Sequence, residues 1–256
     1  MRRRFSPGPG VWTVLALALA VCLWEWAAAG GHVNPFFFSR PSLIWAEFWE
    51  MVDSGAMGRH LSATLEEAGL GLLFGALLGS LAGFALGVAP RVSRALMPLL
   101  TGLNGLPKLA LGPLIIIWFG LGLRSKVLIA GLMVFFVFVF NLYSGVRAVE
   151  PELIAAVKLL GGTRRQVMGK VILPASLPWL LASLRTSLGL SLSGAIVGEY
   201  LGASRGMGWV IADAGERYDM ERVLCCVLVI VLVVVLLDCV VRLLERWLLR
   251  WQAPAA

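Results

Sequence analysis

Six apolar runs divide this sequence, and they constrain its fold more than any other feature. They cover residues 11–29, 68–89, 96–122, 127–149, 179–201 and 223–241. A helix that crosses a bilayer needs about 20 mainly apolar residues. Only 14% of the residues are charged, whereas a soluble domain has about a quarter. The sequence therefore predicts an all-α, polytopic membrane protein with about six transmembrane helices, the first of them an uncleaved span behind three arginines.

The lysines and arginines between these runs predict the orientation of the chain, because cytoplasmic loops carry an excess of them. With the N-terminus inside, thirteen basic residues are cytoplasmic and seven are outside, and Lys108 and Arg185 lie within runs. The inside set is Arg2, Arg3, Arg4, Arg91, Arg94, Arg147, Lys158, Arg164, Arg165, Lys170, Arg242, Arg246 and Arg250. The outside set is Arg40, Arg59, Arg124, Lys126, Arg205, Arg217 and Arg222. We expect both termini in the cytoplasm and attribute the net charge of +7 to topology and anionic lipid rather than to nucleic acid.

Two runs carry glycine or proline in informative positions. In the second run glycine recurs at every fourth residue from Gly71 to Gly87, which favours close helix packing over the alternative of a substrate site. The third run is interrupted by Pro98, Pro107 and Pro113. It predicts a broken span, which is tolerated where it is buried in protein or lines a wet cavity. Lys108 in this run either faces such a cavity or reaches the headgroups or a structural contact.

Several charged residues stand at the edges of the runs. Glu66 and Glu67 precede the second run, and Arg124 and Lys126 are predicted to form a short turn between the third and fourth runs. Glu199 stands near the far end of the fifth run, before a glycine-rich polar stretch.

The polar segment 150–178 lies between the fourth and fifth runs and carries four basic residues. It cannot cross the membrane, because each charge at mid-bilayer costs about 2.5–3.5 kcal/mol. Pro151 is typical of a first helical turn, the Gly161-Gly162 pair breaks that helix, and Thr163 can cap a second helix. Pro174 and Pro178 are expected to end the second helix. One interpretation is a docking element for a partner, and the other is an amphipathic segment at the membrane surface.

Several of these motifs resemble one protein family. The spacing from Gly161 to Val171-Ile172-Leu173-Pro174 resembles the signature of ATP-binding cassette (ABC) importer permeases. Three further stretches resemble the sulfonate, taurine and nitrate permeases of that family: Pro41-Ser42 with Trp45, Leu106-Pro107-Lys108-Leu109-Ala110 through Trp118-Phe119-Gly120, and Glu199 with the glycines that follow.

The resemblance implies a type I importer permease fold with a cytoplasmic coupling-helix loop, residues 150–176, that docks on a separate ATPase. One departure concerns Ala155, which stands where the family usually has glutamate, with Glu152 about one turn earlier. The coupling residues implied are Glu152, Ala155, Ala156, Lys158, Gly161, Gly162, Arg164, Arg165 and Pro174. The predicted substrate pathway contains Asn104, Pro107, Lys108, Asn141, Ser191 and Glu199.

Partners and domains follow from the same resemblance. The chain has no G-x-x-x-x-G-K-[ST] phosphate loop, so ATP and Mg²⁺ are expected on the partner ATPase, with no cofactor, metal or catalytic residue in this chain. A second permease copy and an extracytoplasmic solute-binding protein complete the expected assembly. The predicted domains are residues 1–63, an N-terminal span with an external segment, 64–245, the permease core, and 246–256, a cytoplasmic tail.

The predicted function is uptake of a small anionic solute through the inner membrane. Two alternatives remain: a permease for another solute, such as bicarbonate or a vitamin precursor, and a non-transport membrane anchor.

Overall fold

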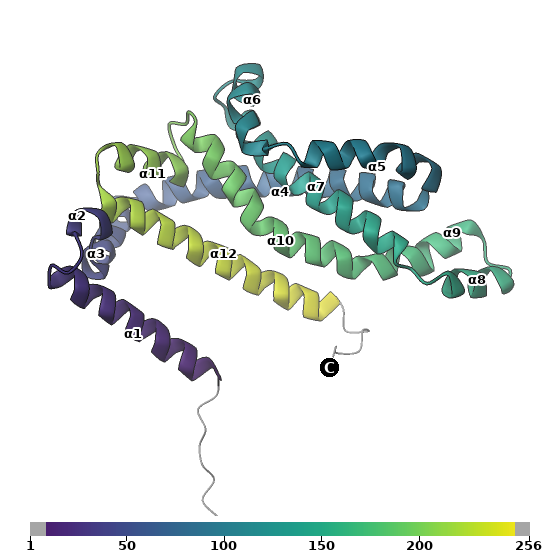
Figure 1. The fold of residues 1–256 in the computed structure, drawn as a ribbon, viewed down its shortest axis with the longest axis horizontal. Coiled ribbons are helices and arrows are strands. Elements are labelled where there is room, and N and C mark those ends of the chain that lie inside the picture. Colours follow the sequence, from purple (N-terminus) through teal and green to yellow (C-terminus); the bar gives the residue numbers. More distant parts are fainter. Residues whose placement is uncertain (1–8, 249–256) are drawn as a thin grey trace, which may run out of the picture. The chain divides into compact units, whose positions relative to one another are not determined.

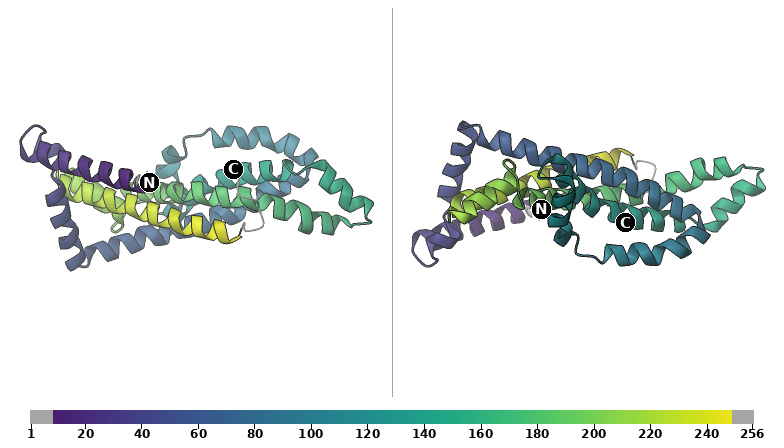
Figure 2. Two further views of the ribbon diagram at one scale, coloured as in Figure 1. Left: turned by 90° about the horizontal axis from the view of Figure 1, so that it is seen from below. Right: turned by 90° about the horizontal axis from the view of Figure 1, so that it is seen from above.

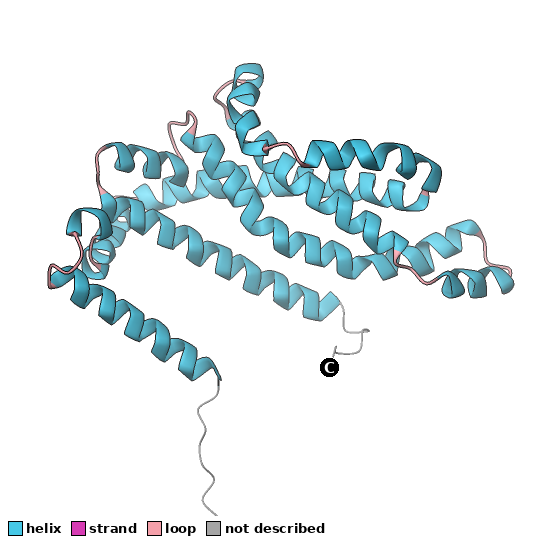
Figure 3. Cartoon of the chain, viewed as in Figure 1, coloured by secondary structure: helices cyan, strands magenta, loops and turns pink. Residues whose placement is uncertain are grey.

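The computed structural model describes residues 9–248, and in that part of the chain it consists of helices joined by loops, with no strand (Figures 1 and 3). This confirms the all-α prediction. Residues 1–8 and 249–256, which include Arg2–Arg4, Arg250 and most of the predicted tail, lie outside the described residues. The helices are α1 Pro9–Ala29, α2 Pro35–Phe38, α3 Pro41–Asp53, α4 Ala56–Val88, α5 Pro90–Asn104, a 3₁₀ turn Lys108–Leu111, α6 Gly112–Phe119, α7 Leu123–Arg147, α8 Pro151–Leu159, α9 Arg164–Val167, a π-helical turn Met168–Ile172, α10 Leu173–Tyr200, α11 Met207–Glu216 and α12 Met220–Leu248.

Five of the six predicted spans correspond to helices that are long enough to cross a membrane, if the bent pair is counted as one span. Four helical segments are long and apolar enough to cross a membrane: Ala56–Val88, Leu123–Arg147, Arg164–Tyr200 and Met220–Leu248. The pair Pro90–Asn104 and Lys108–Phe119 counts as a fifth span and is bent by 79° at its break, which confirms the broken span predicted from its prolines. In α1 the apolar stretch Leu15–Ala29 falls short of the same length criterion.

The chain forms two compact units, and the smaller one contains residues up to Arg59 together with Val210–Val229. In this unit Ser42, in the first turn of α3, donates from its backbone N and its Oγ to the carboxylate of Glu25 on α1, at 3.0 and 2.9 Å. The Arg222 guanidinium is paired with Glu47 of α3, with Nε 2.6 Å from Oε1. These contacts explain why a Pro-Ser pair opens α3: proline starts the helix and serine ties it to α1.

The larger unit, His60–Trp209 with Ile230–Ala256, is built around α4, α7 and α10 (Figure 1). The α4 glycines face α7: a Cβ added at Gly75 would lie 2.5 Å from the backbone oxygen of Gly131, and one at Gly79 would lie 2.5 Å from that of Phe135. The predicted close packing is thereby confirmed, and it occurs inside this chain. Buried side chains of α7 continue the core toward α10, with Val134, Phe138 and Leu142 packed against Leu180 and Leu184.

Two groups of charged side chains in the larger unit form ion pairs. Arg185 of α10 and Arg242 each place Nε 2.7 Å from a carboxylate oxygen of Asp238 on α12. The short turn predicted at Arg124 and Lys126 is wrong, because α7 begins at Leu123 and Lys126 lies inside it, 5% exposed. An ion pair with Glu67, in which Lys126 Nζ is 2.7 Å from Oε1, allows the charge to be buried. The second span also begins earlier than predicted, since α4 starts at Ala56.

Candidate functional site

The segment between α7 and α10 folds as the sequence predicts in its first half. Pro151 stands in the first turn of α8, and Gly161 has φ 77°, a left-handed conformation that favours glycine. Thr163 caps α9 in a capping box: its side chain accepts from Gln166 N, and the Gln166 side chain accepts from Thr163 N at 2.7 Å. Both the helix break and the cap are confirmed. Figures 1 and 2 show α8 and α9 projecting beyond the end of α7.

The prediction that Pro174 and Pro178 end the second short helix is wrong. α9 passes through the π-helical turn Met168–Ile172 directly into α10, which contains both prolines and runs to Tyr200. Pro174 stands in the first turn of α10, where a missing N–H is tolerated, and the wider π turn lies just before it. The coupling segment and the fifth span are therefore one continuous helical segment.

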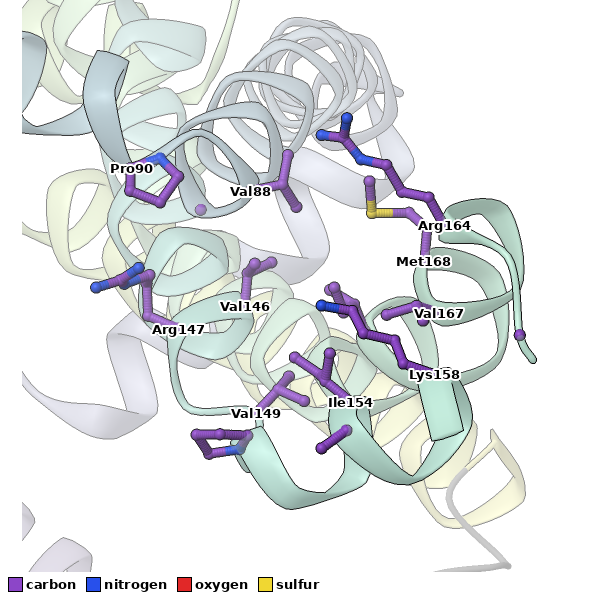
Figure 4. A pocket seen from close by; sticks show the side chains of 15 residues that line it. Val88, Pro90, Val146, Arg147, Val149, Ile154, Lys158, Arg164, Val167 and Met168 are labelled. Carbon is purple, nitrogen blue, oxygen red and sulfur yellow. The ribbon is translucent and has the colours of Figure 1, made fainter. Parts of the chain in front are cut away.

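A pocket of about 840 Å³ lies between this segment and the ends of α4 and α7 (Figure 4). Its walls are apolar and include Val146, Ile154 and Val167, and its lining contains no acidic residue. Arg147, Lys158 and Arg164 supply positive charge from three different helices. None of these three side chains forms an ion pair with the described part of the chain. The site is thus an apolar hollow with an unneutralised basic lining.

The predicted coupling residues divide between the pocket and the outer surface. Ala155, Lys158, Gly162 and Arg164 line the pocket. Glu152, Ala156, Gly161 and Arg165 are exposed elsewhere on the segment, and Pro174 is half-buried in α10. The end of α8 carries two leucines that were not predicted as contacts: Leu159 and Leu160 are 87% and 88% exposed. Such apolar side chains at the tip of a short helix are available to a partner.

The predicted pathway residues fall into two environments. Lys108 Nζ donates to the backbone O and the Oδ1 of Asn104, at 2.8 and 2.9 Å, and lies 5.0 Å from the ring centroid of Phe136. These contacts hold the break between α5 and α6 against α7. Pro107 is exposed and Asn141 is half-buried. Ser191 and Glu199 are 2% and 1% exposed.

A second polar group, at the other end of α7, was not assembled from the sequence. It contains Thr64 and Glu67 of α4, Lys126 of α7 and Glu199 of α10. Lys126 and Arg147 mark the two ends of α7, about 31 Å apart at 1.5 Å per residue. The signal in the sequence was the presence of isolated charges of both signs at the edges of apolar runs. We assigned Lys126 to a short turn and Glu199 to the substrate pathway.

Sequence comparison relates the chain to a family of membrane transport proteins. Residues 75–250 match the family model described as "Binding-protein-dependent transport system inner membrane component". The chain is 36% identical to the putative aliphatic sulfonates transport permease protein SsuC of Bacillus subtilis, over 98% of this chain and 90% of that protein. It is 32% identical to the riboflavin transport system permease protein RibX of Chloroflexus aurantiacus, over 96% and 91%.

The fold is also similar to that of a solved transporter. An inward-facing structure of the MetNI methionine ABC transporter superposes with a TM-score of 0.69 at 19% identity, covering 76% of this chain and 97% of that chain. At this identity the likeness concerns the fold alone, and it confirms the predicted importer permease architecture. With a family model that spans residues 75–250 and a sulfonate permease relative along nearly its whole length, the chain belongs to the binding-protein-dependent inner membrane components, the permease subunits of ABC importers.

Proposed function

We propose that two copies of this chain form the translocation pathway of an ATP-driven importer for a small anionic solute of the sulfonate, taurine or nitrate kind. The observation that carries this proposal is the projecting α8–α9 segment, with its exposed leucines and basic pocket, in a chain of the permease family. A separate ATPase would bind that segment from the cytoplasm, where both termini would also lie, and a solute-binding protein would deliver the solute from outside.

The continuity of α9 with α10 supplies a mechanical route for this function. ATP and Mg²⁺ would bind to the partner ATPase, whose closure moves α8 and α9. Because no loop separates α9 from α10, a displacement of Arg164–Val167 is transmitted along the helix to Tyr200. The two permease subunits would change conformation because the closed ATPase contacts one of their two conformations more favourably than the other.

Deleting residues 155–162 tests the attachment to the ATPase. The deletion removes the second half of α8 and the glycine turn, so we expect stoichiometric co-purification with the ATPase to be lost while the chain remains in the membrane fraction. The same experiment separates an importer subunit from a membrane anchor, which would bring down no ATPase. An ATPase that stays bound to the deleted chain would contradict the assignment.

The solute pathway is predicted to follow the broken span and to include Asn104, Pro107, Lys108, Asn141, Ser191 and Glu199. Lys108 is the cation among them, and its ammonium is fixed by Asn104. Lys108→Met is expected to lower uptake of an anionic solute at least tenfold, the effect of losing about 1.4 kcal/mol of attraction, without lowering ATPase co-purification. Arg246→Met, a charge change at an exposed residue near the end of α12, is the control. Equal uptake by the Lys108 variant and the wild type would show that Lys108 is not part of the solute pathway.

The riboflavin relative favours a second candidate solute, a vitamin or vitamin precursor, and bicarbonate remains an alternative anion. A thermal-shift screen of the partner binding protein against sulfonates, taurine, nitrate, bicarbonate and riboflavin distinguishes these solutes. A ligand that raises the melting temperature of the binding protein binds to it, and we expect that ligand to be the solute that the permease transports.

A further inference from the structure

The pocket between the α8–α9 segment and the ends of α4 and α7 has a basic lining without a counter-charge. Lys158 and Arg164 lie on one side of the hollow and Arg147 lies on the other (Figure 4). Within the described residues, no carboxylate oxygen lies within 4.0 Å of a charged nitrogen of these three side chains. Glu150 and Glu152 are close in sequence, but both are exposed and neither lines the pocket. Like charges around one hollow repel each other, so an anion between them is bound favourably.

The pocket lies where two membrane-spanning helices end. Val88 is the last residue of α4 and Arg147 is the last residue of α7, and both line the pocket. α7 has 25 residues, which is about 37 Å of helix, whereas the hydrocarbon core of a bilayer is about 30 Å thick. The last turn of α7 therefore extends into the headgroup layer, which places the pocket at the depth of lipid phosphates.

The volume and the walls of the pocket distinguish between candidate anions. Its volume of about 840 Å³ is typical of sites for small organic ligands, which measure about 300–1,000 Å³. Val146, Ile154 and Val167 make part of the wall apolar. An inorganic anion would leave this wall uncovered. A phospholipid instead places its phosphate among the basic side chains and its glycerol and first acyl carbons on the apolar wall.

A second hollow continues the positive charge beside the first. It has a volume of about 410 Å³, is lined by Arg91 and Arg94 in the first turns of α5, and shares Pro90 with the pocket. Neither arginine forms an ion pair within the described part of the chain. No acidic residue among those described lines either hollow. The positive charge is therefore a property of this whole end of the helices.

We propose that the pocket binds the headgroup of an anionic phospholipid, with its phosphate between Arg147, Lys158 and Arg164. Basic pockets between membrane helices on the cytoplasmic side bind headgroups of this kind. The lipid joins the α8–α9 segment to the end of α7, because its ligands come from both. Neither Leu159 nor Leu160 lines the pocket, so both leucines remain available to the proposed ATPase. The lipid site requires only that the chain spans a membrane, and it depends on neither the solute nor the ATPase.

Ala155 allows a test that adds a negative charge to the pocket. Ala155 lines the pocket and stands three residues before Lys158 on α8. In Ala155→Glu the new carboxylate pairs with Lys158 and repels a lipid phosphate. The full chain, purified in detergent and freed of lipid, is titrated with phosphatidylglycerol, and native mass spectrometry counts the bound lipid. We expect the affinity of Ala155→Glu for this lipid to be about tenfold lower than that of the wild type.

Ala156→Glu is the matched control for this charge. Ala156 is the next residue of the same helix and is exposed, but it does not line the pocket. Its variant has the same net charge as Ala155→Glu, so a general repulsion of anionic lipid would weaken both equally. We expect Ala156→Glu to bind phosphatidylglycerol within about twofold of the wild type, because a single exposed charge outside the pocket is screened by water.

A second pair of variants removes positive charge and decides the question if Ala155→Glu does not fold. Each basic side chain near an anionic headgroup contributes about fivefold to the affinity. The double variant Lys158→Gln and Arg164→Gln should therefore bind phosphatidylglycerol about 25-fold more weakly than the wild type. Arg165→Gln with Lys170→Gln removes the same charge from two exposed side chains that do not line the pocket. This control should bind within about threefold of the wild type.

Two other ligands test the chemistry of the headgroup. Phosphatidylcholine, whose choline group cancels the charge of its phosphate, should bind about tenfold more weakly than phosphatidylglycerol. Phosphatidylglycerol at saturation should raise the melting temperature of the lipid-free chain by about 5 °C. Inorganic phosphate should raise it by less than about 1 °C, because it does not cover the apolar wall.

Four outcomes would overturn the proposal. They are equal affinity for the two lipids, equal stabilisation by inorganic phosphate, equal phosphatidylglycerol affinity in the pocket variants and their controls, and loss of ATPase co-purification from pocket variants that bind the lipid normally. The last of these would assign the pocket to the ATPase. The lipid measurements use the permease alone, so a failure of the proposed transport function would not alter them.

Discussion

Replacing Gly79 by leucine is expected to prevent this chain from folding. A Cβ at this position would lie 2.5 Å from the backbone oxygen of Phe135 and 2.8 Å from Phe138 Cβ. A backbone oxygen inside a helix cannot move aside, so α4 and α7 must separate. Their contact extends from Gly71 to Gly87, about 24 Å of helix at 1.5 Å per residue. We expect a loss of more than about 4 kcal/mol, which places the change among the most severe single substitutions.

The measurement is the yield of monodisperse protein after membrane extraction, together with its thermal unfolding. Gly69→Leu is the matched control, because Gly69 lies on the same helix and a Cβ there would meet nothing within 4 Å. Its melting temperature should stay within about 2 °C of the wild type, since surface substitutions change stability little. Gly79→Ala, which adds only the Cβ, should fall between the two. A Gly79→Leu protein as stable as Gly69→Leu would show that α4 and α7 do not pack through their glycines.

The second large effect is expected at the tip of α8. Changing both Leu159 and Leu160 to aspartate should reduce co-purification with the ATPase at least tenfold while leaving the permease folded. The two side chains are 87% and 88% exposed, so their replacement removes no packing within the chain. Loss of one buried apolar anchor at an interface costs about 2 kcal/mol or more, and each 1.4 kcal/mol is about tenfold in affinity.

This double substitution is more selective than the deletion of residues 155–162, because it keeps the glycine turn and the basic pocket. Leu121→Asp is the control: it adds a charge to an exposed leucine just before α7, at the opposite end of that helix from α8. The control should bind the ATPase as the wild type does. If the double variant also binds normally, the ATPase contacts the basic pocket or another surface, and the exposed leucines are not its anchor.

The sequence predicted the features that depend on local chemistry. Apolar runs of about 20 residues indicated the spans, the prolines around Pro107 indicated the 79° break, and Gly161 and Thr163 indicated the turn and cap of the coupling segment. The glycines of α4 predicted a close helix contact, although not that α7 supplies it. Each of these signals lies within a few residues of the structure that it specifies, so no knowledge of distant contacts was needed.

Only the tertiary structure decided which distant groups meet. Lys126 was predicted to lie in a short turn between two apolar runs, whereas it is buried, and Glu67, 59 residues away, is what makes its burial possible. The partners of Glu199 were likewise not predicted: they are Thr64 on α4 and Gly208 in the first turn of α11. The passage of α9 into α10 through a π turn was also missed, because both prolines were taken as helix ends, whereas Pro174 lies in the first turn of α10 and Pro178 inside that helix. Pairing of buried charges and continuity of helices depend on packing in three dimensions, which local sequence patterns do not encode.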